Sequence, residues 1–477
     1  MSDERITLNN LEGILRRVEM GPTTAMREGE DIALARSLFG ALRAKILDGT
    51  WNHGDKLPGT RALARDAGMS RWTAVVAVDM LIAEGLVETR SRSGTYVSWI
   101  GNGAYLRRNQ VQEGTQPQAP FAVGTPGLDL FPARLWQELQ TKAWSSMPAT
   151  ALHTGHAAGW PDLQESIAAH VAATRAIRCS PDQVFVTTSA HAALTLACEV
   201  VARPGSVAWL EEPGYFRARA AVEASGVSPV GVCLDTEGVD IDDGLRLAPK
   251  AGLAVVTPSF QFPTGISMSV ERRQRLLQWS ADVGSFIIED DYACEFHEAP
   301  PAPLMAMPGA DRVLYMNSFS VTTFPSLRLC YLVVPRPLVE RFSLALRNGD
   351  RYATVPNQIV LAEFLSHGHF QRHLELCGEQ YRQRHDTLRR AMSAWPDVFA
   401  SEPRSAGLHL CARFRNRFDD VAMAQAALDA GVVVEPLSRF FAGERKQSGL
   451  LLGFAGFPPA ALTHAASVLG RILGAHA

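Results

Sequence analysis

Residues 313–334 read "VLYMNSFSVTTFPSLRLCYLVV" and contain two apolar runs separated by a polar turn. Each run has the length of one buried strand and is rich in residues that favour strands. A strand that is apolar on both faces is typical of a parallel sheet covered by helices on both sides. The turn carries serines, Pro325 and Arg328. This stretch therefore predicts an α/β sheet whose strand ends carry polar groups.

The same alternation continues through residues 121–477. Apolar stretches of strand length lie at 183–188, 206–212, 252–258, 285–291, 313–319 and 329–335. Between them lie stretches with helical periodicity, for example 162–173, 192–201 and 270–281. Strands that alternate with helices predict a mostly parallel sheet with helices on both faces. Residues from about 421 onward predict a smaller α/β lobe.

Polar residues follow several of the predicted strands, where such sheets bind ligands. Ser189, Ala190 and His191 open a helix whose backbone N–H groups can hold a phosphate. Tyr215 follows the next strand and can lie flat on a ring. The other candidates at strand ends are Gln261, Asp290, Tyr292, Ser318 and Arg328. Each alone is explained by a cap, a turn or a surface acid, but their order along the chain favours one ligand pocket.

The first hundred residues predict a different domain. Leu34, Leu38, Leu42 and Ile46 form one helical stripe, and a short helix capped by Thr60 follows. The next helix starts after Ser70, and two short strands then flank a turn at Gly94. This order predicts a winged helix-turn-helix at 31–99, a connector rich in Gln, Gly and Pro at 100–120, and the α/β domain at 121–477.

In a winged helix-turn-helix, the N-terminal end of the recognition helix enters the major groove of DNA. Residues 31–98 hold nine Lys/Arg against seven acids, on a chain with a net charge of −3. The alternative is a small helical domain whose arginines only solvate its surface. The predicted DNA contacts are Arg61, Ser70, Arg71, Trp72, Thr73, Arg90, Arg92 and Gly94.

Composition indicates a soluble globular protein, with 47% hydrophobic and 20% charged residues among 477. No apolar run is long enough to span a membrane, and the first ten residues are polar, so we expect a cytoplasmic protein without a secretory signal. The seven cysteines are scattered and include no CxxC pair. They predict reduced thiols and no metal site.

Two resemblances make these predictions specific. The motifs "LPGTRALA" (57–64), "SRWT" (70–73), "LIAEGLVE" (81–88) and "SGTYV" (93–97) resemble the GntR-type winged helix. Residues from about 121 to 475 resemble a fold-type I aminotransferase domain, and the whole chain resembles the MocR subfamily of GntR-type regulators. The resemblance implies a double-stranded DNA operator, a head-to-tail homodimer and pyridoxal 5′-phosphate in the C-terminal domain. It also implies transcription that responds to the cofactor or to an amino compound.

The resemblance also implies roles for single residues of the pocket. Asp290 would pair with the pyridine nitrogen of the cofactor, and Tyr292 with its ring hydroxyl. Tyr215 would stack on the ring, and Ser318 and Arg328 would hold the phosphate.

The covalent anchor departs from the family pattern. "SVTTFPSLRLCY" places Val321 where the family has the lysine that forms the Schiff base. Because valine has no amine, an internal aldimine cannot form at this position. No lysine lies between the last two of the five in the chain, which are Lys45, Lys56, Lys142, Lys250 and Lys446.

Other pocket positions depart as well. Ala190 and His191 stand where the family has glycine and glutamine, and Phe260 replaces a polar ring. Thr154 aligns with a family tyrosine, and Leu451 lies near the place of an arginine that binds substrate carboxylate in aminotransferases. Most of these changes make the predicted pocket less polar.

We therefore expect a DNA-binding transcription regulator and no enzyme, because transamination needs a lysine to form imines and carry protons. The competing class is an aminotransferase with an accessory domain. For the C-terminal domain three roles stay open: non-covalent binding of another small-molecule effector, dimerisation or a protein contact, and non-covalent binding of pyridoxal 5′-phosphate. In an empty cleft, Arg328 would pair with Asp290 or Asp291.

Overall fold

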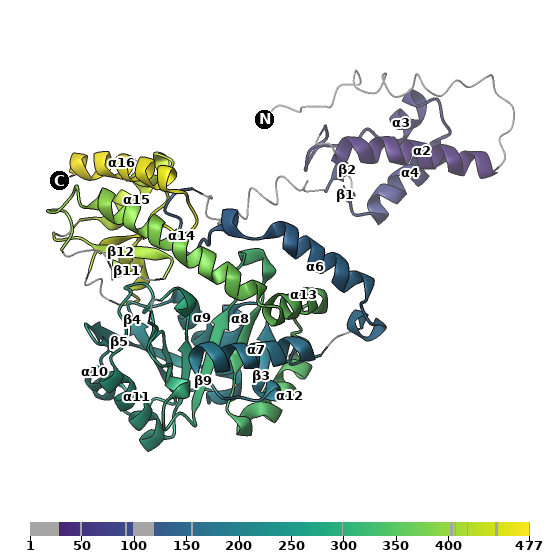
Figure 1. Ribbon diagram of the computed structural model, residues 1–477. Coiled ribbons are helices and arrows are strands. Elements are labelled where there is room, and N and C mark those ends of the chain that lie inside the picture. Colours follow the sequence, from purple (N-terminus) through teal and green to yellow (C-terminus); the bar gives the residue numbers. More distant parts are fainter. Residues whose placement is uncertain are drawn as a thin grey trace. The chain divides into compact units, whose positions relative to one another are not determined.

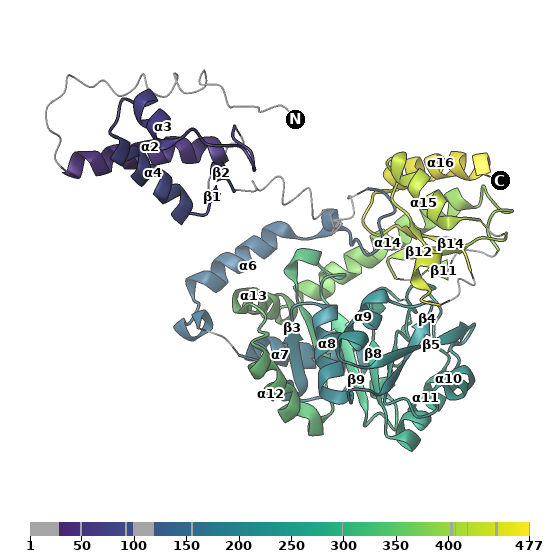
Figure 2. The ribbon, with the colours of Figure 1, turned by 180° about the vertical axis from the view of Figure 1, so that it is seen from behind.

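The computed structural model describes residues 28–47, 50–90, 93–98, 119–153, 156–297, 299–400, 404–405, 407–416, 418–443 and 447–476. Arg92, Thr154, Lys446 and most of the predicted connector lie outside the described residues. The chain divides into two compact units, Met1–Thr115 and Gln116–Ala477, which are drawn in Figures 1 and 2.

The first unit has the order of elements that its sequence predicts. Its helices are α2 (Glu28–Leu47), α3 (Thr60–Asp66) and α4 (Arg71–Ala83), and its hairpin is β1 (Val87–Arg90) and β2 (Gly94–Val97). Leu38, Leu42 and Ile46 of α2 are buried against Ala74 and Leu81 of α4 in one apolar core. Helical periodicity thus places the face of α2 that closes this domain.

Ser70 caps α4, as predicted, because its Oγ accepts a hydrogen bond of 3.1 Å from the backbone N–H of Thr73. The predicted cap Thr60 is wrong. Gly59 occupies the N-cap position of α3 and Thr60 is already the first helical residue, so no side chain caps that helix.

The second unit is built on an eight-stranded sheet with the order β3-β10-β9-β8-β7-β4-β5-β6. Neighbours among β4, β5, β7, β8 and β9 run parallel, whereas β10 is antiparallel to both β3 and β9. The predicted mostly parallel sheet is therefore confirmed. Its strands are β3 (Val184–Thr187), β4 (Val207–Glu212), β5 (Ser228–Asp235), β6 (Gly238–Val239), β7 (Leu253–Val256), β8 (Phe286–Asp290), β9 (Val313–Ser318) and β10 (Cys330–Val333).

Helices cover both faces of this sheet, as Figures 1 and 2 show. On one face, Phe185 and Leu210 join the core formed by α8 (Ala190–Val201), α9 (Phe216–Ala224) and α12 (Val339–Gly349). Their chain neighbours Val184 and Trp209 point to the opposite face, as the two-residue period of a strand requires. That face is covered by α6 (Ala133–Ser145), α7 (Pro161–Arg175), α10 (Ile241–Leu247), α11 (Val270–Val283) and α13 (Val355–Ser366).

The small lobe contains an antiparallel sheet with the order β11-β12-β14-β13. Its elements are α14 (His369–Met392), β11 (Arg404–Ser405), β12 (His409–Arg413), α15 (Asp420–Asp429), β13 (Glu435–Pro436), β14 (Gly449–Gly453) and α16 (Pro459–His476). The predicted start near residue 421 is too late, because β11 and β12 belong to the same sheet as β14.

Among the helices of the described ranges, none combines the length and apolarity needed to cross a membrane. All seven cysteines are free thiols. No group of three or more His, Cys, Asp or Glu side chains within the described residues is arranged to hold a metal ion.

Candidate functional site

The sheet brings the predicted pocket residues to one edge. Because β4, β7, β8 and β9 are parallel, Glu211, Thr257, Asp290 and Ser318 all lie at or next to the carboxyl ends of their strands. The antiparallel β10 enters from that edge, and Cys330 pairs with both Thr187 and Ser318. Segments distant in sequence therefore meet where doubly wound sheets bind ligands.

The three acids around the end of β8 have different surroundings. Glu289 is buried and accepts hydrogen bonds from the backbone N–H groups of Leu304 and Met305, at 2.7 and 3.0 Å. Asp291 is buried in an ion pair with Arg175, with Nε and Oδ2 2.7 Å apart. Asp290 lies between these two acids and points to the other face of the sheet.

Asp291 has a full set of partners besides Arg175. Its carboxylate also accepts hydrogen bonds from the hydroxyl groups of Ser259 and Tyr315. Arg175 is itself fixed further by the carbonyl of Pro301, at 3.0 Å. A buried carboxylate with a guanidinium and two hydroxyl donors is satisfied, so Asp291 is a structural residue of the sheet edge.

Asp290 makes no ion pair with any described residue, and the backbone N–H of Tyr292 is the only hydrogen-bond donor that lowers its pKa. Burial, together with the nearby Asp291 and Glu211 carboxyls, raises the pKa of Asp290 to about 7. The expected pairing of Arg328 with Asp290 or Asp291 does not occur. Arg328 is exposed, at φ +54°, and Asp291 is already taken by Arg175.

Aromatic rings form one wall beside Asp290. Phe262 lies at the centre, with edge-to-face contacts to Tyr215, Tyr292, His409 and Phe440 at centroid distances of 5.3 to 6.1 Å. Burial raises the pKa of Tyr215 to about 12, and the Asp290 carboxyl contributes to the shift. Tyr215 and Asp290, both of which the resemblance places on the ring of the cofactor, are therefore neighbours.

The Tyr292 hydroxyl is buried and makes no hydrogen bond of ordinary length and angle within the described chain, although the Leu408 backbone N–H is close enough to lower its pKa slightly. Burial outweighs this contact and raises the pKa of Tyr292 well above its usual value. A buried hydroxyl without a good partner is uncommon in a folded protein. It leaves one hydrogen-bonding position open beside Asp290.

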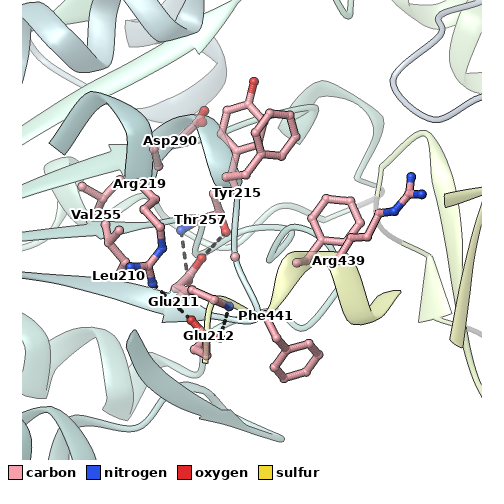
Figure 3. A pocket seen from close by; sticks show the side chains of 15 residues that line it. Leu210, Glu211, Glu212, Tyr215, Arg219, Val255, Thr257, Asp290, Arg439 and Phe441 are labelled. Atoms are coloured by element: carbon pink, nitrogen blue, oxygen red, sulfur yellow. Dashed lines mark hydrogen bonds and ion pairs between the residues drawn. The ribbon is translucent and has the colours of Figure 1, made fainter. Parts of the chain in front are cut away.

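A cavity of about 130 Å³ lies next to these groups (Figure 3). Glu211, Tyr215, Thr257 and Asp290 line it from the sheet side, and Phe440 lines it from the small lobe. The Glu211 carboxyl accepts hydrogen bonds from the hydroxyl and the backbone N–H of Thr257, at 2.6 and 3.1 Å. Burial nevertheless raises the pKa of Glu211 to about 7. The wall of the cavity is thus mainly apolar, but it contains three carboxyls, those of Glu211, Glu212 and Asp290, together with Arg219 and Arg439.

Glu212 closes the rim of this cavity by linking it to the small lobe. Its carboxylate accepts a hydrogen bond from the backbone N–H of Gly443, at 3.2 Å, and another from that of Ala442. Arg219 pairs with the same carboxylate at 3.4 Å, as Figure 3 shows. At the rim, the negative charge of Glu212 is therefore compensated by Arg219. Asp290 has no such cationic partner among the described residues.

At the start of α8 the arrangement fits an anion only in part. The Ser189 Oγ accepts a hydrogen bond of 3.1 Å from the backbone N–H of Ala192, so it already caps the helix. The His191 Nδ1 is buried without a partner in the described chain. Ser318 accepts a hydrogen bond of 3.3 Å from the backbone N–H of Ser320. Ala190 packs against the apolar core.

Two predicted pocket residues have apolar or structural surroundings. Gln261 is buried, and its side-chain amide bonds to Glu211 and to the backbone carbonyl of Pro213 while its carbonyl accepts from Thr264. Val321 is half-buried and packs against the apolar core of the small lobe. Its isopropyl group therefore contributes to the contact between the two lobes of this unit.

In the first unit, Arg61, Arg71 and Trp72 are exposed, and the Trp72 side chain has 52% of its surface in solvent. Thr73, also predicted to contact DNA, is fully buried, and its hydroxyl bonds to Ser70 at 2.7 Å and to Asp31 at 3.3 Å. In the described conformation Thr73 therefore holds the start of the recognition helix and does not reach outward.

Sequence reasoning missed Glu211, Phe262, Phe440 and Lys56. The sequence could have indicated Glu211, because Glu211 and Glu212 are adjacent acids at the end of an otherwise apolar strand. Adjacent strand residues point to opposite faces of the sheet, so one of the two acids had to face inward. Phe440 lies in another lobe and had no local signal. Lys56 forms a β-bridge with Tyr96 of the wing, and no sequence pattern predicts this bridge.

Comparison with known proteins agrees with both units. The family "Bacterial regulatory proteins, gntR family" matches residues 34–97. The second unit resembles LysN, the α-aminoadipate aminotransferase of Thermus thermophilus, with a TM-score of 0.68 and 27% identity over 75% of this chain and 93% of that chain. The protein therefore combines a GntR-type DNA-binding domain with the fold of a type I aminotransferase.

Relatives that share both parts are also found. The "Probable rhizopine catabolism regulatory protein MocR" of Rhizobium meliloti is 34% identical over 90% of this chain and 91% of its own. The "HTH-type transcriptional regulator TauR" of Rhodobacter capsulatus is 30% identical over 90% of this chain and 94% of its own. The chain belongs to the MocR subfamily of GntR-type transcription regulators.

Proposed function

We propose that this transcription regulator binds a double-stranded DNA operator through residues 31–99 and a small molecule, without a covalent bond, through residues 121–477. The observation that carries the second part is Asp290, a carboxyl beside a cavity that has no cation to pair with among the described residues. A domain used only for dimerisation or protein contact has no reason to retain an acid without a cationic partner at the wall of a cavity, because taking a charge partly out of water without a partner is unfavourable.

The fold family implies pyridoxal 5′-phosphate, and the pocket fits this group in part. Asp290 can pair with a protonated ring nitrogen, Tyr292 can bond to a ring hydroxyl, and Tyr215 can cover the ring. When bound, the cofactor supplies an aldehyde and an electron-withdrawing ring. Val321 offers that aldehyde no amine, so this chain can hold the group only by non-covalent contacts.

Two ligand classes remain, and both place a cationic nitrogen beside Asp290. The first is an effector other than the cofactor, for which the support is the cavity with its Glu211 and Asp290 carboxyls, neither of which makes an ion pair within the described residues. The second is pyridoxal 5′-phosphate itself, which the open hydrogen-bonding position of Tyr292 favours. For either ligand we propose a regulator without transaminase activity, and a head-to-tail homodimer as in the family.

Native mass spectrometry of the chain purified from cells, followed by titration with pyridoxal 5′-phosphate, tests this proposal. We expect any bound small molecule to leave on denaturation, and binding to weaken strongly in Asp290→Asn. Asp311→Asn is the matched control, because it removes an exposed carboxylate from the same unit. Equal ligand binding by both variants and the unchanged chain would show that Asp290 faces no ligand.

A further inference from the structure

Lys56 lies on the wing of the DNA-binding unit. It forms a β-bridge with Tyr96, on the side of β2 opposite to β1. The Leu57 N–H donates a hydrogen bond of 2.8 Å to the Thr95 carbonyl, and the Val97 N–H one of 2.9 Å to the Asp55 carbonyl. These bonds make residues 55–57 a third strand-like segment of the wing, so the Lys56 side chain shares a face with Tyr96.

Two cations flank the Tyr96 ring on this wing. The Lys56 Nζ lies 5.7 Å from the ring centroid, and the guanidinium carbon of Arg90 lies 4.7 Å from it. Both distances are within the range of a cation–π contact. The ring itself is oriented by the Ser93 hydroxyl, 2.7 Å from the Tyr96 hydroxyl.

The two cations differ in whether an acidic side chain compensates their charge. Arg90 is paired with Glu88 at 2.7 Å, so much of its charge is compensated within the wing. Lys56 is exposed and makes no ion pair with any residue in the part of the chain that the structure describes. Of the two cations beside Tyr96, Lys56 therefore has the charge more available to a phosphate.

Gly94 determines where the Lys56 side chain can run. A Cβ atom built on Gly94 would lie 2.8 Å from the Lys56 Cε and 3.6 Å from its Nζ. Side chains essentially never approach a Cβ this closely, so any residue other than glycine would displace the end of Lys56. Glycine is thus favoured at this position by its φ of +124°, and it also leaves the space that the flexible end of Lys56 occupies.

Resting on the DNA binding proposed above, we propose that Lys56 is a DNA-phosphate contact of the wing and that Gly94 leaves the space in which its side chain lies, besides any contact of its own with DNA. Tyr96 supports the aliphatic end of Lys56, and the ammonium group projects from the exposed wing. Such a contact adds affinity for any duplex and reads no base sequence.

The test is a salt titration of binding to a mixed-sequence DNA duplex by the full chain and its Lys56→Gln variant. Loss of one phosphate contact should lower affinity several-fold and reduce the slope of log affinity against log salt by about 1. Lys56→Arg should restore most of both. Lys142→Gln, a lysine of the second unit, is the charge-matched control. An unchanged slope in Lys56→Gln would overturn the proposal.

A double-variant comparison tests the role of Gly94. Gly94→Ala should reproduce the loss seen in Lys56→Gln and should add little when Lys56 is already replaced. Gly54→Ala controls for backbone strain, because Gly54 lies in the same unit and has a φ of +91°, beyond the usual left-handed helical range, but open space around it. Thermal melting of each variant shows whether the unit remains folded. Independent, additive losses in folded variants would contradict the coupling of Gly94 to Lys56.

Discussion

Replacing Asp290 by asparagine should stabilise the protein at neutral pH and not at acidic pH. The pKa of Asp290 rises from 3.8 to about 7 in the folded chain. A group with a raised folded-state pKa contributes stability at pH values below its unfolded pKa, and that contribution is lost as the pH rises through the folded value. Between pH 4 and 7 the unchanged chain should therefore lose stability that Asp290→Asn retains.

The full shift corresponds to about 4 kcal/mol at pH 7.5, since each pKa unit is worth about 1.4 kcal/mol. Asp290 lines a cavity that water can enter, so we expect roughly half of this, about 2 kcal/mol. At pH 5 the same reasoning predicts that Asp290→Asn exceeds the unchanged chain in unfolding free energy by less than half of the difference at pH 7.5. The side chain is isosteric, so the asparagine introduces no new packing cost.

Denaturant unfolding of the C-terminal unit at pH 5 and pH 7.5 measures this difference. The other buried acids with raised pKa values, Glu211, Glu289 and Glu295, are common to both chains and largely cancel in the comparison. Asp311→Asn should show no such pH dependence. A stability gain for Asp290→Asn that is equal at both pH values, or a loss at pH 7.5, would refute the assignment of Asp290 as a partly exposed carboxyl without a cationic partner.

Three further changes have predictable results. Arg175→Met leaves Asp291 buried without its guanidinium partner and should destabilise the second unit by about 3–5 kcal/mol, measured by denaturant unfolding; an unchanged midpoint would contradict a buried ion pair. Arg71→Ala should weaken binding to an operator selected from random DNA by about 1–3 kcal/mol more than binding to mixed-sequence DNA, and equal losses in competition assays would make Arg71 a phosphate contact instead. Ser70→Ala removes the cap of the recognition helix and should cost about 1 kcal/mol in thermal melting of the first unit, whereas Ser70→Asp should keep most of it; identical melting of the two variants would exclude a capping role.

Much of the large fold follows from apolar patterning. The six predicted strands are continuous apolar runs, and all six are present in the central sheet. β5 was missed because its sequence, "SPVGVCLD", contains Pro229 and Gly231, which disfavour strands in isolation. Its place is set by pairing with the whole length of β4. Tertiary pairing of this kind overrides local preference and leaves no signal within the strand itself.

Of the ten predicted pocket residues, Tyr215 and Asp290 line the cavity and the other eight do not. Strand ends supplied Asp290, Tyr292 and Tyr215, because parallel strands deliver their carboxyl ends to one edge. Which acid of the "EDD" run is left unpaired depends on Arg175, 116 positions away in sequence from Asp291. Contacts over such distances depend on helix packing, so the sequence could not show that Asp291 is satisfied and Asp290 is not.

In the wing, too, contacts between residues that are distant in sequence could not be predicted. The sequence predicted a turn at Gly94 between the two strands of the wing. Its second role depends on Lys56, which reaches the wing from the segment before α3. Arg90 was predicted to contact DNA from its place on the wing, and the sequence did not show that it also pairs with Glu88.

Borohydride treatment followed by mass spectrometry tests the central claim most directly. In the unchanged chain saturated with pyridoxal 5′-phosphate, peptides from residues 251–445 should show no added mass after reduction. These residues contain no lysine that could form an imine with the cofactor. Val321→Lys should gain one reduced adduct that maps to position 321 if the pocket accepts the ring as proposed. A cofactor adduct in the unchanged chain that depends on Asp290 would contradict the account, since it would show that an amine from elsewhere reaches this pocket.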